Sequence, residues 1–132
     1  MAKSFRDNGS NSLVIYDDLD KHTNAYKKSN LLMRNPSRRE AYPRDIFYIH
    51  ARLLERAGQF RTAYGYGSLT ALPIVEIKGD SIDTYIATNL ISITDGQWFL
   101  SKDLTKRRIY PALDVERSVS RVRRKAQPAL MA

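Results

Sequence analysis

The stretch Leu13-Val14-Ile15-Tyr16-Asp17-Asp18 is an apolar run that ends in two carboxylates. Its length is that of a buried parallel strand with the acids at its C-terminal end. Ligands of open α/β sheets bind just beyond such strand ends, where a carboxylate can hold Mg²⁺ beside a nucleotide. Asp is also a common helix N-cap. The run alone favours the cap over the metal site, so the rest of the chain has to decide between them.

Two helices are predicted after this strand. The first runs from about Lys21 to Met33 and has a loose apolar face. The second has the clearest pattern in the sequence: it opens near Pro43 with Asp45 as its N-cap, and its apolar residues recur at three- and four-residue spacing. We expect His50 on this helix to be a packed or capped side chain, because no second metal ligand accompanies it.

Strands and helices continue to alternate after the second helix. The predicted elements are a strand over Leu69 to Ile77, a short helix over Ile82 to Leu90, a β-branched strand over Ile91 to Thr94, and a return strand over Trp98 to Leu100. Pro73 marks an irregularity, an edge or an end of the first of these strands. Asp95-Gly96 predicts a hairpin turn. The alternation predicts an α/β domain with a largely parallel sheet.

The composition excludes several classes of site. The chain has 132 residues, which suits one domain or a piece of one. It has no cysteine and two histidines, which excludes disulfides and thiolate metal sites and disfavours a histidine-rich one. No apolar run approaches the ~20 residues of a membrane-spanning helix. The first residues lack the apolar core expected of a secretory signal.

The net charge of +8 favours an anionic partner. Nucleic acid, an anionic membrane surface and an acidic protein are the three kinds considered. The basic clusters are not interleaved with aromatic residues, so a single-stranded nucleic-acid platform is not favoured. Solvated or subunit-facing charges are the simpler interpretation of these clusters, which are Lys27-Lys28, Arg38-Arg39, Lys106-Arg107-Arg108 and Arg121 to Lys125.

Segments spread over the whole chain carry a family resemblance. Phe5-Arg6-Asp7-Asn8-Gly9, followed by Leu13 to Leu19, resembles the segment around the Walker B strand of the alpha-subunit family of rotary ATP synthases. Ser118-Val119-Ser120-Arg121-Val122 resembles the stretch that carries the arginine of that family. The resemblance continues, in order and without large gaps, through Arg39 to Pro43, Phe47 to Ala57, Gly67 to Pro73, Thr88 to Gln97 and Pro111 to Ser120.

The resemblance implies a partial RecA-like P-loop NTPase domain, of the α/β class, with a mostly parallel sheet and flanking helices. Residues 1–132 would be the C-terminal half of the alpha subunit's nucleotide-binding domain. The sequence contains no G-x-x-x-x-G-K-[ST] motif, so the phosphate loop is missing from it. The family's N-terminal β-barrel and C-terminal helical bundle are expected to be absent from this chain as well.

The resemblance also implies roles for three residues. Asp17 matches the Walker B acid, which helps to hold Mg²⁺ and ATP or ADP at the alpha subunit's nucleotide site. Arg121 matches the arginine finger, a planar and permanently charged group that reaches into the catalytic site of the beta subunit. Ser92 matches a cofactor-binding position at the same alpha/beta interface, although an ordinary strand serine is nearly as well supported. For Asp18 we prefer a helix N-cap.

The chain departs from the family at several positions. Arg44, Glu116-Arg117 and Arg123 stand where the family usually has glycine, small or apolar residues. A large side chain at a glycine position with positive φ predicts backbone strain. Thr105 and Tyr110 stand where the family has Phe and Arg near the adenine pocket. A stacking surface and a cation are therefore lost there.

The function implied by the resemblance is ATP synthesis or hydrolysis coupled to proton transport, as a subunit piece that is not active alone. ATP or ADP with Mg²⁺ would bind only within a complete assembly. The expected partners are the beta subunit and a complementing N-terminal alpha segment, in a complex peripheral to the mitochondrial inner membrane, the thylakoid or the bacterial plasma membrane. Two alternatives remain open: a truncated or degenerate alpha-subunit copy without a catalytic role, and a basic binding protein that reuses the half-domain.

Overall fold

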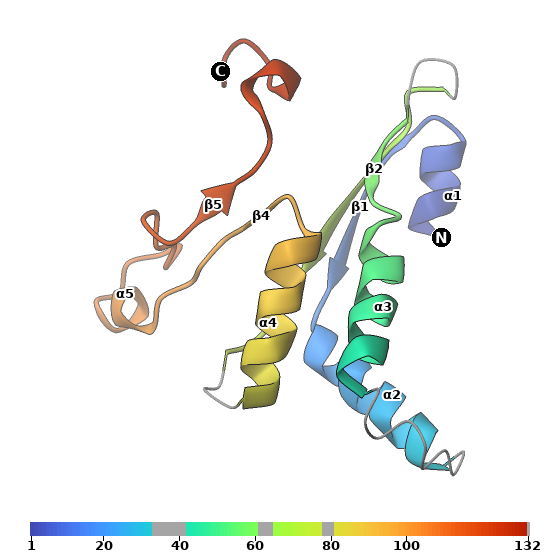
Figure 1. Ribbon diagram of the computed structural model, residues 1–132. Helices are drawn as coiled ribbons and strands as arrows, with labels where there is room; N and C mark the ends of the chain where they lie inside the picture. The colour runs from blue at the N-terminus through green and yellow to red at the C-terminus, as the bar shows by residue number, and fades with distance from the viewer. Residues whose placement is uncertain (33–41, 61–64, 78–80, 132) are drawn as a thin grey trace. The chain divides into compact units, whose positions relative to one another are not determined.

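The computed structural model describes residues 1–32, 42–60, 65–77 and 81–131 (Figure 1). The chain divides into two compact units, Met1–Leu90 and Ile91–Ala132, which we call the first and the second unit. Among the described residues, none of the helices is both long enough and apolar enough to cross a bilayer.

A small sheet organises the first unit. Strand β1 (Asn11–Tyr16) pairs in parallel with β3 (Ser68–Pro73), in a register that places Leu13 opposite Thr70. The short strand β2 (Gly58–Gln59) pairs antiparallel with the start of β3, which gives the order β1-β3-β2. The predicted α/β class and the parallel pairing of the opening strand are confirmed. The burial predicted for that strand is wrong, because its residues are alternately exposed and half-buried.

Helices precede and follow these strands along the chain. The described helices that begin in the first unit are α1 (Ala2–Asp7), α2 (Leu19–Leu32), α3 (Tyr42–Leu54) and α4 (Ser81–Ile93). Figure 1 shows β1 and β3 between α3 and α4. Burial falls at helical spacing, as at Ile46 and His50 of α3 and at Ile86 and Leu90 of α4, because one stripe of each helix faces the core. The buried apolar side chains of the first unit are Leu19, Ile46, Ala51, Leu54, Leu69, Ile86 and Leu90.

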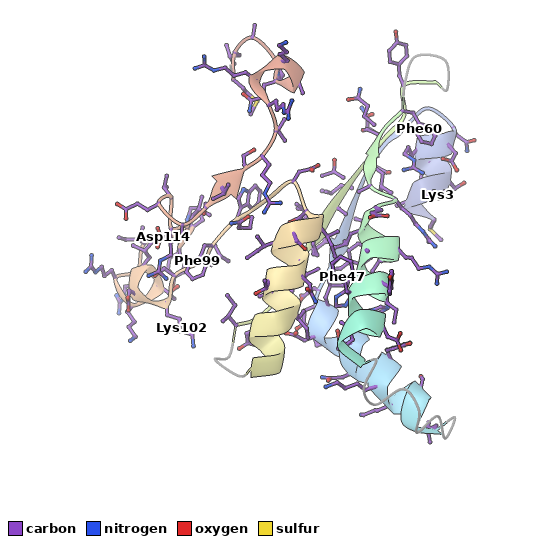
Figure 2. The ribbon with its side chains drawn as sticks, viewed as in Figure 1. Lys3, Phe47, Phe60, Phe99, Lys102 and Asp114 are labelled. Atoms are coloured by element: carbon purple, nitrogen blue, oxygen red, sulfur yellow. The ribbon has the colours of Figure 1, made fainter. Side chains whose placement is uncertain are left out.

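Arg6 joins three segments at one end of the sheet. Its buried guanidinium donates a hydrogen bond to the carbonyl of Arg56 and lies 4.3 Å from the ring centroid of Phe60, which Figure 2 labels. Its Nε lies 3.5 Å from the carboxylate of Asp7. A Cβ at Gly67 would overlap the Arg6 carbonyl oxygen, so only glycine allows this close approach. The contacts hold α1, the end of α3 and the start of β3 together.

One face of β1 is apolar and exposed. Successive side chains of a strand point to opposite faces. Leu13 and Ile15 share a face and are 59% and 57% exposed. Ser12, on the other face, donates a 3.0 Å hydrogen bond to the carbonyl of Ala2 in α1. The helix α1 therefore lies on the face opposite to Leu13 and Ile15.

The second unit contains short elements. They are β4 (Gly96–Gln97), α5 (Lys102–Lys106), β5 (Val119–Ser120), which pairs antiparallel with β4, and the 3-10 helix η3 (Arg124–Ala126). An antiparallel bridge joins Leu100 to Leu113. Ala112 is buried, whereas Trp98 is 76% exposed. The unit therefore has a small core and several exposed apolar side chains.

The strand predicted over Ile91 to Thr94 is wrong, because α4 continues to Ile93. Ile86 and Leu90 of this helix are buried four residues apart. Burial of that stripe outweighs the β propensity of the β-branched residues that follow, since propensity is only a weak preference. Ser92 is consequently a helical residue.

The hairpin predicted at Asp95-Gly96 is also wrong. Gly96 lies in β4, opposite Ser120 of β5. A Cβ at Gly96 would lie 2.5 Å from the carbonyl oxygen of Val119, so this glycine permits close approach of two strands and does not form a turn. The return strand predicted over Trp98 to Leu100 is replaced by the single Leu100 bridge.

Other boundaries shift by a few residues. The strand predicted over Leu69 to Ile77 runs only from Ser68 to Pro73, so of the three possibilities at Pro73 the structure has the strand end. Asp45 lies in the first turn of α3, not at its N-cap, because the helix already begins at Tyr42. The predicted helix end at Met33 and the Arg38-Arg39 cluster lie outside the described residues.

Candidate functional site

The end of β1 leads into α2 through Asp17 and Asp18, whose connecting peptide is cis. Two backbone hydrogen bonds hold this connection, which we call the corner. The N–H of Ile74 donates to the carbonyl of Tyr16 at 3.0 Å, and the N–H of Leu19 donates to the carbonyl of Ile74 at 3.1 Å. Leu19 is itself buried. Both acids therefore lie just beyond the end of a parallel strand, as the sequence predicted.

Asp18 acts as the N-cap of α2. Its Oδ1 accepts a 2.9 Å hydrogen bond from the backbone N–H of Lys21, three residues on. Its Oδ2 lies 3.9 Å from Nζ of Lys21. A carboxylate in this position satisfies one of the unpaired N–H groups of the helix and interacts favourably with its dipole. The cap predicted for Asp18 is confirmed.

Asp17 has an exposed carboxylate. Within the described ranges, it has no hydrogen bond or ion pair. Mg²⁺ keeps several waters and takes one or two carboxylates together with phosphate oxygens, so one free carboxylate at a strand end suits it. No group of three or more His, Cys, Asp or Glu side chains in the described part of the chain could hold a metal by itself. Phosphate oxygens and water would have to complete the coordination.

A buried polar contact lies behind this corner. His50 of α3 is 1% exposed, and its Nε2 lies 3.2 Å from Oγ1 of Thr23 in α2. The Thr23 hydroxyl donates to the carbonyl of Leu19 at 3.0 Å, so the proton shared with His50 belongs to Nε2. Burial, and to a smaller extent the nearby His22, lower the pKa of His50 to about 4. The packed side chain predicted for His50 is confirmed.

Arg121 follows directly after β5 in the second unit. Its backbone N–H donates a 2.7 Å hydrogen bond to the carbonyl of Asp95. Its side chain is exposed, so the guanidinium is accessible. Ser92 is also exposed and lies in the last turn of α4, three residues before Asp95. The hydrogen bond thus links the segment that follows Ser92 with the one that carries Arg121.

A second turn supports the segment that precedes Arg121. Ser118 Oγ accepts a 3.0 Å hydrogen bond from the N–H of Phe99 and donates a 2.6 Å one to the carbonyl of Asp114. Oδ1 of Asp114 accepts hydrogen bonds from the N–H groups of Glu116 and Arg117. Figure 2 shows Phe99 and Asp114 next to each other. Asp followed four residues later by Ser was the sequence pattern that could have indicated this turn.

Arg117 adds a side-chain contact to the same turn. Its guanidinium lies 5.0 Å from the ring centroid of Phe99, and its Nε lies 3.6 Å from the carboxylate of Asp114. Sequence reasoning treated Arg117 only as a departure from the family. The structure shows that this residue has local partners.

The strain predicted at the replaced glycine positions is not found where the backbone is described. Arg123 has a φ of −68°, an ordinary value for any residue. The backbone of Arg44 lies within α3. Positive φ values at non-glycine residues of the described chain occur instead at Tyr66 and Arg108, with φ of 61° and 58°. Thr105 and Tyr110 are both exposed.

The predicted site residues thus fall into two groups. Asp17 lies in the first unit, at the corner that Asp18 caps. Ser92 and Arg121 lie in the second unit, on two segments that the Asp95 carbonyl connects. Sequence reasoning missed Thr23, which supplies the partner of His50.

Comparison with known proteins places this chain in a family. Residues 1–120 match the family model described as the ATP synthase alpha/beta family, nucleotide-binding domain. The chain is 57% identical to the mitochondrial ATP synthase subunit alpha of Dictyostelium citrinum over 131 residues, which are 99% of this chain and 25% of that protein. It is 58% identical over 127 residues to the ATP synthase subunit alpha of Aquifex aeolicus (strain VF5), and equally so to that of Orientia tsutsugamushi (strain Ikeda).

These two latter matches each cover 96% of this chain and 25% of the relative. The chain therefore spans about a quarter of the length of the curated relatives that it matches. The chain belongs to the ATP synthase alpha/beta family, and within that family it resembles the alpha subunit.

Proposed function

We propose that this chain forms part of the alpha subunit of a proton-transporting rotary ATP synthase, as the C-terminal half of a RecA-like nucleotide-binding domain. The observation that carries the proposal is the 57% identity to an alpha subunit over 131 residues, which includes the segments of all three candidate site residues. The phosphate loop, absent from this sequence, would come from a complementing N-terminal alpha segment. The complex would be peripheral to a mitochondrial, thylakoid or bacterial membrane.

In this assembly, Asp17 would help to hold Mg²⁺ beside the phosphates of ATP or ADP. Its exposed carboxylate at a strand end supports that role. Asp18 is engaged with the N–H of Lys21 and would not compete for the metal. Ser92 would contribute to the alpha/beta interface from the last turn of α4.

Arg121 would act in the catalytic site of a beta subunit. A guanidinium suits the charge that spreads over a transferring phosphoryl group, because it is planar and always protonated. Arginine fingers of this kind accelerate phosphoryl transfer by roughly 10³–10⁵-fold. The exposed side chain of Arg121, on a backbone held by Asp95, fits a residue that acts on a neighbouring subunit.

Affinity purification of the tagged chain from its own cells tests the proposal. We expect a beta subunit and an alpha-type chain that carries a phosphate loop to co-purify. In that complex, Arg121→Ala should lower ATP hydrolysis by roughly 10³-fold or more, whereas Arg123→Ala, a neighbouring exposed arginine, should leave it near the unmodified rate. Equal rates for the two variants would reject the catalytic role of Arg121.

A degenerate copy without a catalytic role is the second candidate. The replacements Thr105, Tyr110 and Arg123, at positions linked by resemblance to the adenine pocket and the finger, favour it. A purified complex that contains the chain but shows the same ATP hydrolysis with Arg121→Ala would support this candidate. Failure to recover any beta subunit would do the same.

A further inference from the structure

The strand pairing that leads to Arg121 is short. β4 and β5 pair at two positions, and the N–H of Arg121 continues the pairing through its 2.7 Å hydrogen bond to the carbonyl of Asp95. A two-stranded ladder is at best marginally stable by itself. The backbone of Arg121 therefore depends on the contacts that hold the other end of β4 and β5 together.

Phe99 lies at that other end, two residues after β4. Its N–H donates a 3.0 Å hydrogen bond to Oγ of Ser118, the residue directly before β5. Its carbonyl accepts a 2.8 Å hydrogen bond from the N–H of Asp114. Both polar backbone groups of Phe99 are thus paired with the turn from Asp114 to Ser118, which leads through β5 to Arg121 (Figure 2).

Arg117 joins the same two residues through its side chain. Its guanidinium lies 5.0 Å from the ring centroid of Phe99, and its Nε lies 3.6 Å from Oδ2 of Asp114. The side chain of Arg117 is 68% exposed and that of Asp114 is 25% exposed, so the contact lies on the outside of the turn. Arg117 therefore reinforces the backbone hydrogen bond between Phe99 and Asp114 without being part of the core.

We propose that Arg117 is a positioning residue for Arg121. Its contacts with Phe99 and Asp114 keep the turn before β5 closed, and the closed turn keeps the backbone of Arg121 paired with Asp95. A cation that stabilises a transition state has to be held in place before the reaction, because small displacements cost rate. The proposal rests on the proposed function, in which Arg121 acts on the phosphoryl group, and adds the residue that fixes its backbone.

Hydrogen exchange at the backbone N–H of Arg121, measured by NMR on the full chain, tests the positioning itself. Arg117→Ala should speed this exchange about 5-fold, because an exposed cation–π contact and an exposed ion pair are each weak. Arg107→Ala is the matched control. Arg107 is an exposed arginine of the same unit, and its side chain has no hydrogen bond or ion pair with the described residues. Equal exchange rates in the two variants would overturn the proposal.

ATP hydrolysis by the complex purified from its own cells tests the consequence for catalysis. Arg117→Ala should lower kcat about 5-fold and leave KM for ATP unchanged, since an arginine finger stabilises charge that develops in the transition state. Arg107→Ala should change neither constant. The double variant with Arg117→Ala and Arg121→Ala should be no slower than Arg121→Ala alone, because a residue that acts only through Arg121 has no effect once that side chain is gone. A further loss in the double variant would overturn the proposal.

Arg117→Lys separates the charge of the side chain from its general stabilising effect on the turn. The lysine keeps a cation beside Asp114 and over the ring of Phe99, so this variant should keep more than about half of the unmodified kcat. It should also slow hydrogen exchange at Arg121 relative to Arg117→Ala. A lysine variant that behaves like Arg117→Ala in both measurements would overturn the proposal, because the cation would then hold nothing.

The outcomes separate this proposal from the proposed function. If Arg121→Ala lowers ATP hydrolysis and Arg117→Ala does not, the positioning role of Arg117 is wrong and the proposed function stands. If Arg121→Ala has no effect on hydrolysis, the catalytic role of Arg121 fails, and the positioning role fails with it.

Discussion

Oγ1 of Thr23 lies 3.2 Å from Nε2 of His50, so a buried hydrogen bond joins the beginning of α2 to the middle of α3. The beginning of α2 is also where Asp18 caps the helix and where β1 ends. The contact therefore helps to set the position of the helix that follows the proposed metal-binding acid.

Acid should weaken the fold through His50. Its pKa is lowered to about 4 in the folded protein, against about 6.5 when unfolded. The unfolded chain therefore binds more protons between these values, so the contribution of His50 to the free energy of unfolding is complete above pH 6.5 and is lost as the pH falls towards 4. The loss is on the order of 3 kcal/mol. Urea unfolding at a series of pH values measures it.

The matched variant for this experiment is His50→Gln, which has no titrating group. Its free energy of unfolding should depend less steeply on pH between 4 and 6.5 than that of the unmodified chain. The same slope in both proteins would contradict the burial of a neutral His50.

Removing the Thr23 hydroxyl should destabilise the fold. Thr23→Val keeps the shape of the side chain but leaves Nε2 of His50 without its partner, and Nδ1 of His50 has no hydrogen-bond partner in the described structure either. A buried polar group that loses its partner costs about 1–3 kcal/mol. Ser29→Ala is the control, because Ser29 makes a 3.0 Å hydrogen bond to the Ala25 carbonyl on the exposed side of α2. Denaturant unfolding that gives the same small loss for both variants would argue against the buried contact.

Substitution of Asp17 and of Asp18 should have different effects, because only Asp18 caps α2. Asp18→Ala removes the N-cap of α2 and should lower the free energy of unfolding by about 1 kcal/mol. Asp17→Ala removes an exposed side chain and should change it by less than about 0.5 kcal/mol. Retention of Mg²⁺ and nucleotide by the purified complex should show the opposite order of effects. Asp17→Ala should weaken this retention more than Asp18→Ala does. The opposite pattern would exchange the two assignments.

Gly96 should not tolerate a larger residue. A Cβ there would lie 2.5 Å from the carbonyl oxygen of Val119, so Gly96→Ala has to push β5 away from β4. Overpacking of this kind costs about 1–3 kcal/mol. The backbone N–H of Arg121 should then exchange its hydrogen faster, since its bond to Asp95 depends on the pairing of the two strands.

The control for Gly96 is Gly58→Ala in β2. Apart from Gly58 and its two chain neighbours, no atom of the described residues would come within 4 Å of the added Cβ, so hydrogen exchange at Arg121 should remain unchanged. Unchanged exchange in Gly96→Ala as well would show that the β4–β5 pairing does not hold the Arg121 backbone.

The sequence predicted correctly those elements that are determined by residues close together in the chain. The strand before Asp17 and the helix around His50 were found because an apolar run and a helical spacing determine them. Pro73 indicated an irregularity, an edge or an end because it cannot donate to the ladder, and the strand does end there. Elements that depend on distant residues were missed. Gly96 pairs with Ser120, and nothing near Gly96 in the sequence distinguishes a turn from a close approach.

The candidate site was also predictable only in part. Residue type and position indicated a cap at this corner, the resemblance left Asp18 as the residue for it, and the hydrogen bond from Lys21 to Asp18 confirms that choice. Ser92 was placed on a strand because its neighbours are β-branched, whereas burial of Ile86 and Leu90 extends the helix through it. The partner of His50 could not be predicted, because Thr23 lies 27 residues away in the sequence.

Trp98 is the single tryptophan of the chain and is 76% exposed in the second unit. Its indole follows β4, whose partner strand β5 leads directly into Arg121. Selective excitation of tryptophan therefore produces fluorescence from the second unit and none from the first. A protein that covers the second unit would remove water from the indole and move its emission to shorter wavelength. The unmodified chain thus contains an optical reporter of its own association, close to the residue through which it is proposed to act.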